Sequence, residues 1–381
     1  MYSQSEIDEA VAAGALTEEG AAKLRDFFEG QRATPMVDEE QFRLITSFND
    51  IFVSLAAIIL LVAVGWIGQS IGGAMGLVLS ESGGDGPSVI GPLAVAATSW
   101  GLALFFTARR RMALPSILLV FAFVGSVFMT VVFLEGHILF ANQDALEATF
   151  KDNSPATKLL IGGLGAIAAA AAAFAAWIHW RRFRVPVTVA AGAAAASGIA
   201  VAILAMILSS QETDIGNIIL GFILLLGIGM FLFAMRWDSS DPSRVTRRSD
   251  VAFWLHLLAA PMIIHPVFAL LGLTRGEASI GEGLVVVALY VAIAIAALAI
   301  DRRALLVSAL AYVLYALNEL FKQFGAVELN VALTALVIGS SLLLLSAFWH
   351  QARVMVVRPL PQALRARLPN LDRAVSPAPA A

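Results

Sequence analysis

Cysteine is absent from the 381-residue chain, and charged residues make up only 14% of it. The missing cysteine excludes disulfides, thiolate metal sites, iron–sulfur clusters and a cysteine nucleophile. The net charge of −3 is small, so it gives no reason to expect a nucleic-acid partner. The polar N-terminal segment, 1–45, lacks a basic stretch followed by a short apolar one, and we therefore expect no cleavable signal peptide.

Recognisable catalytic motifs are also missing. No glycine-rich loop leads into a Lys-Ser or Lys-Thr pair, no GxSxG is present, and no run of aspartates suits magnesium at a phosphate. The few histidines have neither HxxxH nor ExxH spacing. We therefore predict no catalytic residue, no metal site and no cofactor, and an enzyme is the less favoured class.

What the sequence has in abundance is apolar side chains, which make up 59% of its residues. A water-soluble protein of this length could not bury that much apolar surface in one core, so the surplus must face lipid. Long apolar runs, each able to cross about 30 Å of hydrocarbon as a helix, predict an all-α polytopic membrane protein with about ten transmembrane helices. The predicted spans are 51–71, 89–108, 113–134, 158–180, 186–208, 215–235, 251–273, 281–300, 304–321 and 330–349.

The arginines predict the orientation of these spans. Alternate connections hold 17 basic residues on one side, counting the C-terminal tail, against four on the other, and the N-terminal region has the other four of the 25. By the positive-inside rule the richer side is cytoplasmic. The chain is therefore expected in a bacterial inner membrane with both termini in the cytoplasm, and six of its seven tryptophans near predicted span ends fit an interfacial belt.

Three regions follow from this pattern: 1–45 as a cytoplasmic helical hairpin and linker, 46–350 as the transmembrane domain, and 351–381 as a basic, partly disordered tail. In the hairpin, Thr17 can cap the second helix, and Leu24, Phe27 and Phe28 form an apolar stripe. A hairpin this small cannot bury a core alone. We expect the stripe to dock on the membrane domain or on a protein partner.

The hairpin pattern IDEAVAAGALTEEGAAKL, from Ile7 to Leu24, is followed at the membrane entry by FRLITSFNDI, from Phe42 to Ile51. Together they resemble a bacterial family of multi-spanning inner-membrane proteins of unknown function. The resemblance implies a membrane fold over the whole chain and supplies no activity or site residue.

The candidate polar site lies in the outer half of the predicted membrane domain, where ionisable groups are costly and count as functional candidates. In the ninth span, spacings of three and four residues place several polar side chains on one helical face, with Asn318 beside them. That face is either a self-paired helix end, through Glu319 and Lys322, or a relay or cavity wall. The full candidate set is Glu135, His137, His265, Tyr312, Tyr315, Asn318, Glu319 and Lys322.

Two segments have irregular features. Gly68, Gly72 and Gly76 form a GxxxGxxxG ridge, and the segment 68–79 that contains it either continues the first span, which would then tilt, or forms an interfacial segment. In the seventh span, Pro261 and Pro266 remove two backbone donors and predict a kink.

The sequence favours a membrane scaffold or regulatory protein and leaves two alternatives open, a transporter first and a membrane enzyme second. A membrane scaffold or regulatory protein, binding a partner through its hairpin, fits the scarcity of intramembrane charge. A small-molecule or ion transporter would use the outer polar groups and the double-proline helix. A membrane enzyme on a lipid-linked substrate has only Glu135, His137 and the tyrosines to work with.

Overall fold

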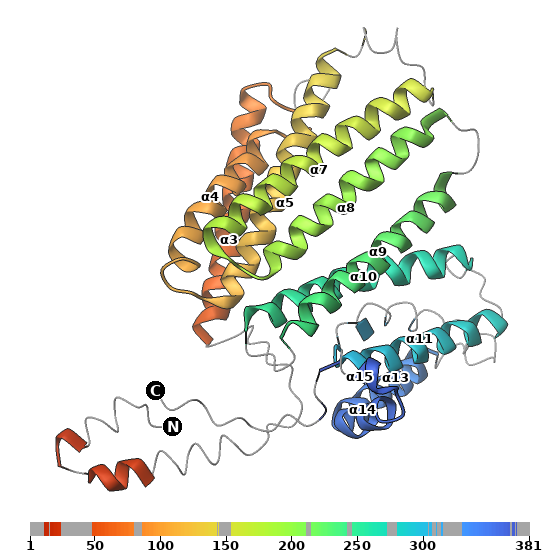
Figure 1. Cartoon of the computed structure of the whole chain (residues 1–381). Coiled ribbons are helices and arrows are strands. Elements are labelled where there is room, and N and C mark those ends of the chain that lie inside the picture. The colour runs from red at the N-terminus through yellow and green to blue at the C-terminus, as the bar shows by residue number, and fades with distance from the viewer. Residues whose placement is uncertain are drawn as a thin grey trace.

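The computed structural model describes a bundle of long helices (Figure 1). It describes residues 11–14, 16–23, 48–79, 86–142, 144, 154–210, 215–241, 246–272, 280–303, 305–306, 310, 314, 330–365, 368–369 and 371. Within these ranges the sole β pairing is one antiparallel bridge between Val78 and Ser88. The helices are α3 (Phe48–Ala74), α4 (Ile90–Phe106), α5 (Ala113–Ala141), α7 (Pro155–Phe183), α8 (Val187–Ile207), α9 (Ile215–Ser239), α10 (Arg247–Leu270), α11 (Ile280–Ile300), α13 (Asn330–Ala347), α14 (Trp349–Val357) and α15 (Gln362–Arg365).

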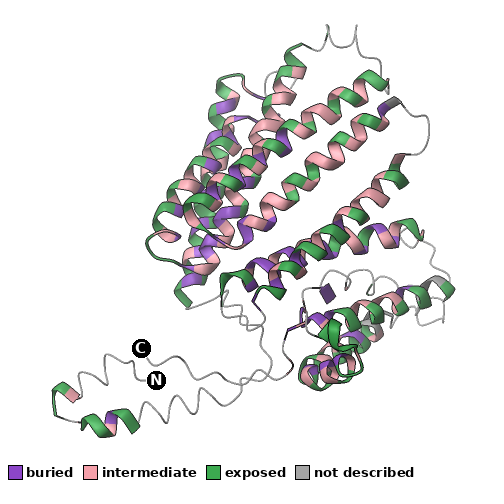
Figure 2. Ribbon diagram, in the orientation of Figure 1, coloured by how far each residue is buried: buried purple, intermediate pink, exposed green. Residues whose placement is uncertain are grey.

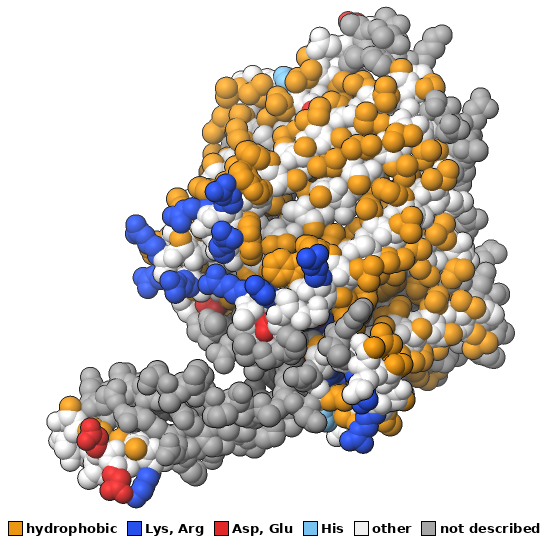
Figure 3. Space-filling view, in the orientation of Figure 1, with side chains coloured by type: hydrophobic (Ala, Val, Ile, Leu, Met, Phe, Trp, Pro, Cys, Tyr) orange, Lys and Arg blue, Asp and Glu red, His pale blue; other side chains and the backbone are white. Residues whose placement is uncertain are grey.

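Six of these helices are long and apolar enough to cross a membrane: α3, α5, α7, α8, α9 and α10. A seventh candidate is the bent pair formed by 335–347 and α14, whose axes differ by 76°. Large apolar side chains point outward, with Trp66 70% and Leu225 66% exposed. Exposed residues run along the whole length of the helices (Figure 2), and orange apolar side chains cover the face seen in Figure 3. This surface suits lipid, and the protein is a multi-pass helical membrane protein.

Helix α4 and residues 284–300 of α11 are also apolar. Each of these apolar stretches is shorter than the six candidate membrane spans. The predicted ninth span, 304–321, lies almost entirely outside the described residues.

Small residues bring α7 and α8 together. Ala176 and Ala169 face Gly192 and Gly198, where an added Cβ would lie 3.5 and 3.6 Å from the alanine methyl groups. Such close backbone approach is how membrane helices associate without a hydrophobic driving force between them. The alanine runs therefore serve tight packing in this pair.

The glycine ridge of α3 packs on the start of α4. A Cβ at Gly68 would lie 2.9 Å from the Gly91 Cα, and one at Gly72 would clash with Ser88. Helix α3 itself continues to Ala74, and Gly76 then takes φ +71°, a left-handed conformation that glycine adopts without strain. The first span therefore includes two of the three ridge glycines, and the third makes the turn.

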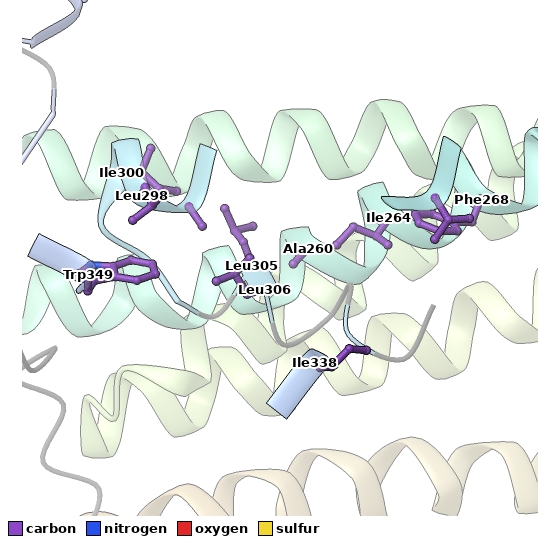
Figure 4. Close-up of a cluster of buried hydrophobic side chains, with 11 residues drawn as sticks. Ala260, Ile264, Phe268, Leu298, Ile300, Leu305, Leu306, Ile338 and Trp349 are labelled. Atoms are coloured by element: carbon purple, nitrogen blue, oxygen red, sulfur yellow. The ribbon is translucent and has the colours of Figure 1, made fainter. Parts of the chain in front are cut away.

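Helix α10 runs unbroken from Arg247 to Leu270 with both prolines inside it. Its side chains Ala260 and Phe268 join Leu298, Ile338 and other apolar side chains in a buried cluster (Figure 4). This cluster unites α10, α11, α13 and α14, and it ends at Trp349, which is only 2% exposed.

Candidate functional site

Two residues of the predicted outer site lie near the end of α5. His137 Nδ1 is 3.2 Å from the carbonyl oxygen of Val78, so the tautomer with hydrogen on Nδ1 donates to the turn that follows α3. Glu135 has a buried Oε1 atom with no hydrogen-bond partner in the described part of the chain.

The turn beside His137 is held by Gln69. Its Nε2 donates to the Gly86 carbonyl at 2.7 Å, and its Oε1 accepts from the Ser88 backbone N–H, also at 2.7 Å. The Ser88 hydroxyl in turn donates to the Gly68 carbonyl at 3.3 Å. One amide side chain of α3 therefore satisfies two backbone groups of the loop between α3 and α4, and fixes that loop to α3.

His265 and His256 lie on opposite faces of α10, since nine residues are two and a half helical turns. His265 is exposed, and His256 is fully buried. The other predicted residues lie outside the described residues: Tyr312, Tyr315, Asn318, Glu319 and Lys322 of the polar face, and Leu24, Phe27 and Phe28 of the hairpin stripe. Whether the outer polar groups share one cavity therefore stays a prediction.

A second polar centre, which the sequence interpretation did not include, lies where α9, α10 and the end of α11 meet. Asp238, next to the last residue of α9, accepts from Arg302 Nε at 3.1 Å and from Arg302 Nη2. His256 Nε2 lies 3.2 Å from the same carboxylate. Asp238, His256 and Arg302 are 2%, 0% and 3% exposed, so this ionic cluster is closed to solvent.

Further contacts complete the coordination of Arg302. Its Nη2 also donates to the Ser249 carbonyl at 3.1 Å and to the Ser249 hydroxyl at 3.3 Å, both at the start of α10. Because a guanidinium carries five fixed N–H donors, it can bridge a carboxylate and a backbone carbonyl at once. Arg302 thereby ties the end of α11 to both α9 and α10.

The two sequence neighbours of Arg302, Asp301 and Arg303, contact α14. Asp301 Oδ1 accepts from Trp349 Nε1 at 2.8 Å, and Arg353 Nε lies 3.8 Å away. The Arg303 guanidinium lies over the Trp349 ring, 4.9 Å from its centroid. The Asp301–Arg302–Arg303 turn, with Asp301 at φ +57°, therefore links α9 and α10 to the start of α14.

This arrangement can hold α9, α10 and the turn after α11 in one relative position. A carboxylate and a guanidinium that are buried together are costly to separate, because each would be left as an uncompensated buried charge. The cluster also joins α9 and α10 to the turn after α11, so its geometry depends on how these helices pack. No group of three or more His, Cys, Asp or Glu residues suited to a metal ion occurs in the described ranges.

A third buried histidine belongs to an aromatic cluster. His179 is fully buried in α7, its Nδ1 is 3.2 Å from the Thr188 hydroxyl, and its ring lies 4.6 Å from that of Phe183 and 6.1 Å from that of Trp100. These contacts fit a packing histidine that joins α7 to α4 and α8.

No family model, curated protein or solved structure matches the chain.

Proposed function

We propose that the protein is a multi-pass transport protein of a bacterial inner membrane, with about ten spans and both termini in the cytoplasm. The buried Asp238–Arg302 ion pair carries the functional part of the proposal. It joins α9 and α10 to the α11 and α14 side of the molecule at the end that the arginine pattern places in the cytoplasm.

Alternating access needs two packed units that change their contacts around a site, and discontinuous helices often form such a site. The 76° bend between α13 and α14 occurs beside Trp349, whose indole N–H is held by Asp301. The Asp301–Trp349 hydrogen bond therefore joins the turn that holds the ionic cluster to the bend. In the proposed mechanism, the ion pair holds the cytoplasmic side closed and its rearrangement moves α14 relative to α10.

The absence of cysteine makes the test direct, since introduced cysteines are the only sites for labels. Spin labels at Arg248→Cys in α10 and Met355→Cys in α14, both exposed, report the distance across the ionic cluster. We expect two distance populations in the reconstituted protein, with Asp238→Asn shifting their ratio. A control pair, Arg248→Cys and Ser239→Cys, joins α9 to α10 and should give one distance. A single, unshifted distance across the cluster would contradict a transport cycle.

The predicted topology has its own test with single cysteines and a membrane-impermeant maleimide. We expect Asn142→Cys and Leu271→Cys to react from the periplasmic side of intact cells. Arg110→Cys and Arg358→Cys should react only after the membrane is opened. The reverse pattern would place both termini outside.

A scaffold or regulatory role is the second candidate, and the position of the N-terminal segment favours it. The described residues in 11–23 lie apart from the bundle in Figure 1. A photo-crosslinking residue at Lys23, which is exposed, should then give a discrete adduct in cells that Phe27→Ala and Phe28→Ala abolish. The same crosslinker at Arg365, on the tail, is the control, and equal adducts at both positions would argue against a specific partner.

A further inference from the structure

Six arginines at one end of the bundle form a basic face. They occupy two short turns, Arg109–Arg111 between α4 and α5, and Arg181, Arg182 and Arg184 between α7 and α8, and all six are exposed. No Asp or Glu occurs in 86–134 or 154–211, the stretches that contain these turns. None of the six has an ion pair within the described residues, and Figure 3 shows the blue side chains gathered at this end.

The two turns are packed side by side. Val185 and Val187, just after the second turn, share a buried cluster with Val120 and Ile117 from the start of α5. Phe183 lies with its ring 5.1 Å from that of Trp100 in α4, and the Arg182 guanidinium lies over the same Phe183 ring. The six charges therefore belong to one surface instead of two separate loops.

Aromatic rings hold several of these guanidinium groups at the boundary with the apolar face. Arg110 lies 5.6 Å from the Phe105 ring centroid, Arg181 5.1 Å from that of Trp177, and Arg184 5.5 Å from that of Trp180. Trp177 is 51% exposed and Phe105 42% exposed, so apolar surface continues directly from the arginines down the helices.

One arginine in each turn also has an unusual backbone conformation. Arg111 and Arg184 both adopt a left-handed conformation, φ +54° and +57°, which costs an ordinary L residue energy and which glycine takes freely. Both turns therefore place an arginine where a glycine would be less strained.

We propose that this face is a binding site for an anionic phospholipid, of the phosphatidylglycerol or cardiolipin class, whose phosphate lies between the two arginine turns. Guanidinium groups bind phosphate through paired N–H donors. The acyl chains lie along the exposed apolar surface below, beside Trp177 and Phe105. A nucleic acid or an acidic protein would match the charge alone, whereas an amphiphile can contact both the arginines and the exposed rings directly below them, so the two-part surface favours an amphiphile.

The test uses the full-length protein in phosphatidylcholine nanodiscs that contain a small fraction of lipid with brominated chains, which quench nearby tryptophan fluorescence. Brominated phosphatidylglycerol should quench more strongly than brominated phosphatidylcholine at equal fraction, because it is enriched beside Trp177 and Trp180. The excess should vanish in a Trp177→Phe and Trp180→Phe variant. Equal quenching by the two lipids in the unaltered protein would overturn the proposal.

Charge variants then assign the site. Each arginine near a membrane surface contributes about 1 kcal/mol, which is roughly fivefold in affinity, so Arg181→Gln, Arg182→Gln and Arg184→Gln together should lower the apparent preference for phosphatidylglycerol at least about tenfold. The control Arg247→Gln and Arg248→Gln removes two exposed arginines at the start of α10, where Asp250 already lies near the charge, and should leave the preference unchanged. An equal loss in the control would show a general surface potential and overturn the site.

The triple variant also removes arginines that set the orientation of the spans, so it could insert incorrectly in the membrane. A single substitution avoids this problem. Arg182→Gln alone leaves five arginines on the face and should lower the preference about fivefold. Adding inorganic phosphate in excess should not displace the brominated lipid, because phosphate lacks the acyl chains. Full displacement by phosphate would show that the face binds a free anion and would overturn the lipid assignment.

Discussion

Asp301 and Trp349 are 48 residues apart in sequence and are joined by one buried hydrogen bond, 2.8 Å from the indole Nε1 to the carboxylate Oδ1. Trp349 is the first residue of α14, directly after the bend that follows α13. The bond therefore fixes where the broken pair lies against the end of α11. It also gives a buried carboxylate one of the donors that it needs.

Replacing Trp349 by Phe keeps most of the ring volume and removes the donor. We expect the free energy of unfolding to fall by about 1–3 kcal/mol, because the Asp301 carboxylate loses a buried partner. Thermal unfolding in detergent measures this loss. Trp66→Phe is the matched control, since Trp66 is 70% exposed on α3, and it should leave the unfolding temperature unchanged. Equal stability of the two variants would show that the bond contributes nothing.

The Asp238–Arg302 pair should show strong coupling. Asp238→Asn leaves the Arg302 guanidinium buried without its carboxylate partner, and breaking such a pair typically costs about 3–5 kcal/mol. The double variant Asp238→Asn with Arg302→Gln should be less destabilised than the sum of the two single changes, because it leaves no lone charge. Chemical unfolding of the unaltered protein, the two single variants and the double variant completes a double-mutant cycle, which gives the coupling energy between the two side chains.

An exposed ion pair provides the comparison for this cycle. Glu19→Gln removes the partner of Lys23 in a pair whose side chains are 80% and 75% exposed. Solvent-exposed pairs of this kind contribute little, so no change in unfolding is expected. Additive losses for Asp238 and Arg302 would mean that their contact does not stabilise the fold.

The helical spans could be predicted from the sequence because a long apolar run has only one stable form in lipid. A helix satisfies all its backbone groups within the segment, and the bilayer leaves no water to satisfy them otherwise. The predicted span 113–134 accordingly lies inside α5, and 215–235 lies inside α9. Their ends extend past the predictions because interfacial helix turns need not be apolar.

The ionic cluster could not be predicted in the same way. Arg302 and Arg303 follow a predicted span, and their position suggested only cytoplasmic loop charges; Trp349, at a span end, suggested an interfacial tryptophan. The structure buries Arg302 and Trp349, because residues from helices far apart in sequence meet them. The one available signal was an aspartate close to cytoplasmic arginines, Asp301 directly before Arg302 and Asp238 two residues after Arg236, and a single sequence gives no distance between the two segments.

Gln69 should control the loop between α3 and α4. Gln69→Leu keeps a similar side-chain volume and leaves the Gly86 carbonyl and the Ser88 N–H without their partner. Unpaired backbone groups are costly when buried, so we expect this loop to open more often. Amide hydrogen exchange at Ser88 should become at least about tenfold faster, a change of about 1.4 kcal/mol in opening free energy. Exchange at Ala57, buried mid-helix in α3, is the internal reference, and equal acceleration at both would indicate global destabilisation instead.

The contact between α9 and α10 depends on one glycine. A Cβ at Gly227 would lie 2.8 Å from both the backbone carbonyl carbon and the oxygen of Met262, and backbone atoms cannot rotate away as a side-chain end can. Met262 directly follows Pro261, so the close approach falls at the first of the two prolines in α10. Gly227→Ala should therefore push the two helices apart and lower stability by about 1–3 kcal/mol, the usual cost of overpacking.

Gly229, two residues further along α9, has nothing within 4 Å of an added Cβ, and Gly229→Ala should be neutral or slightly stabilising because alanine favours a helix. If thermal unfolding shows the same loss for both, the cost lies in α9 itself and not in its contact with α10.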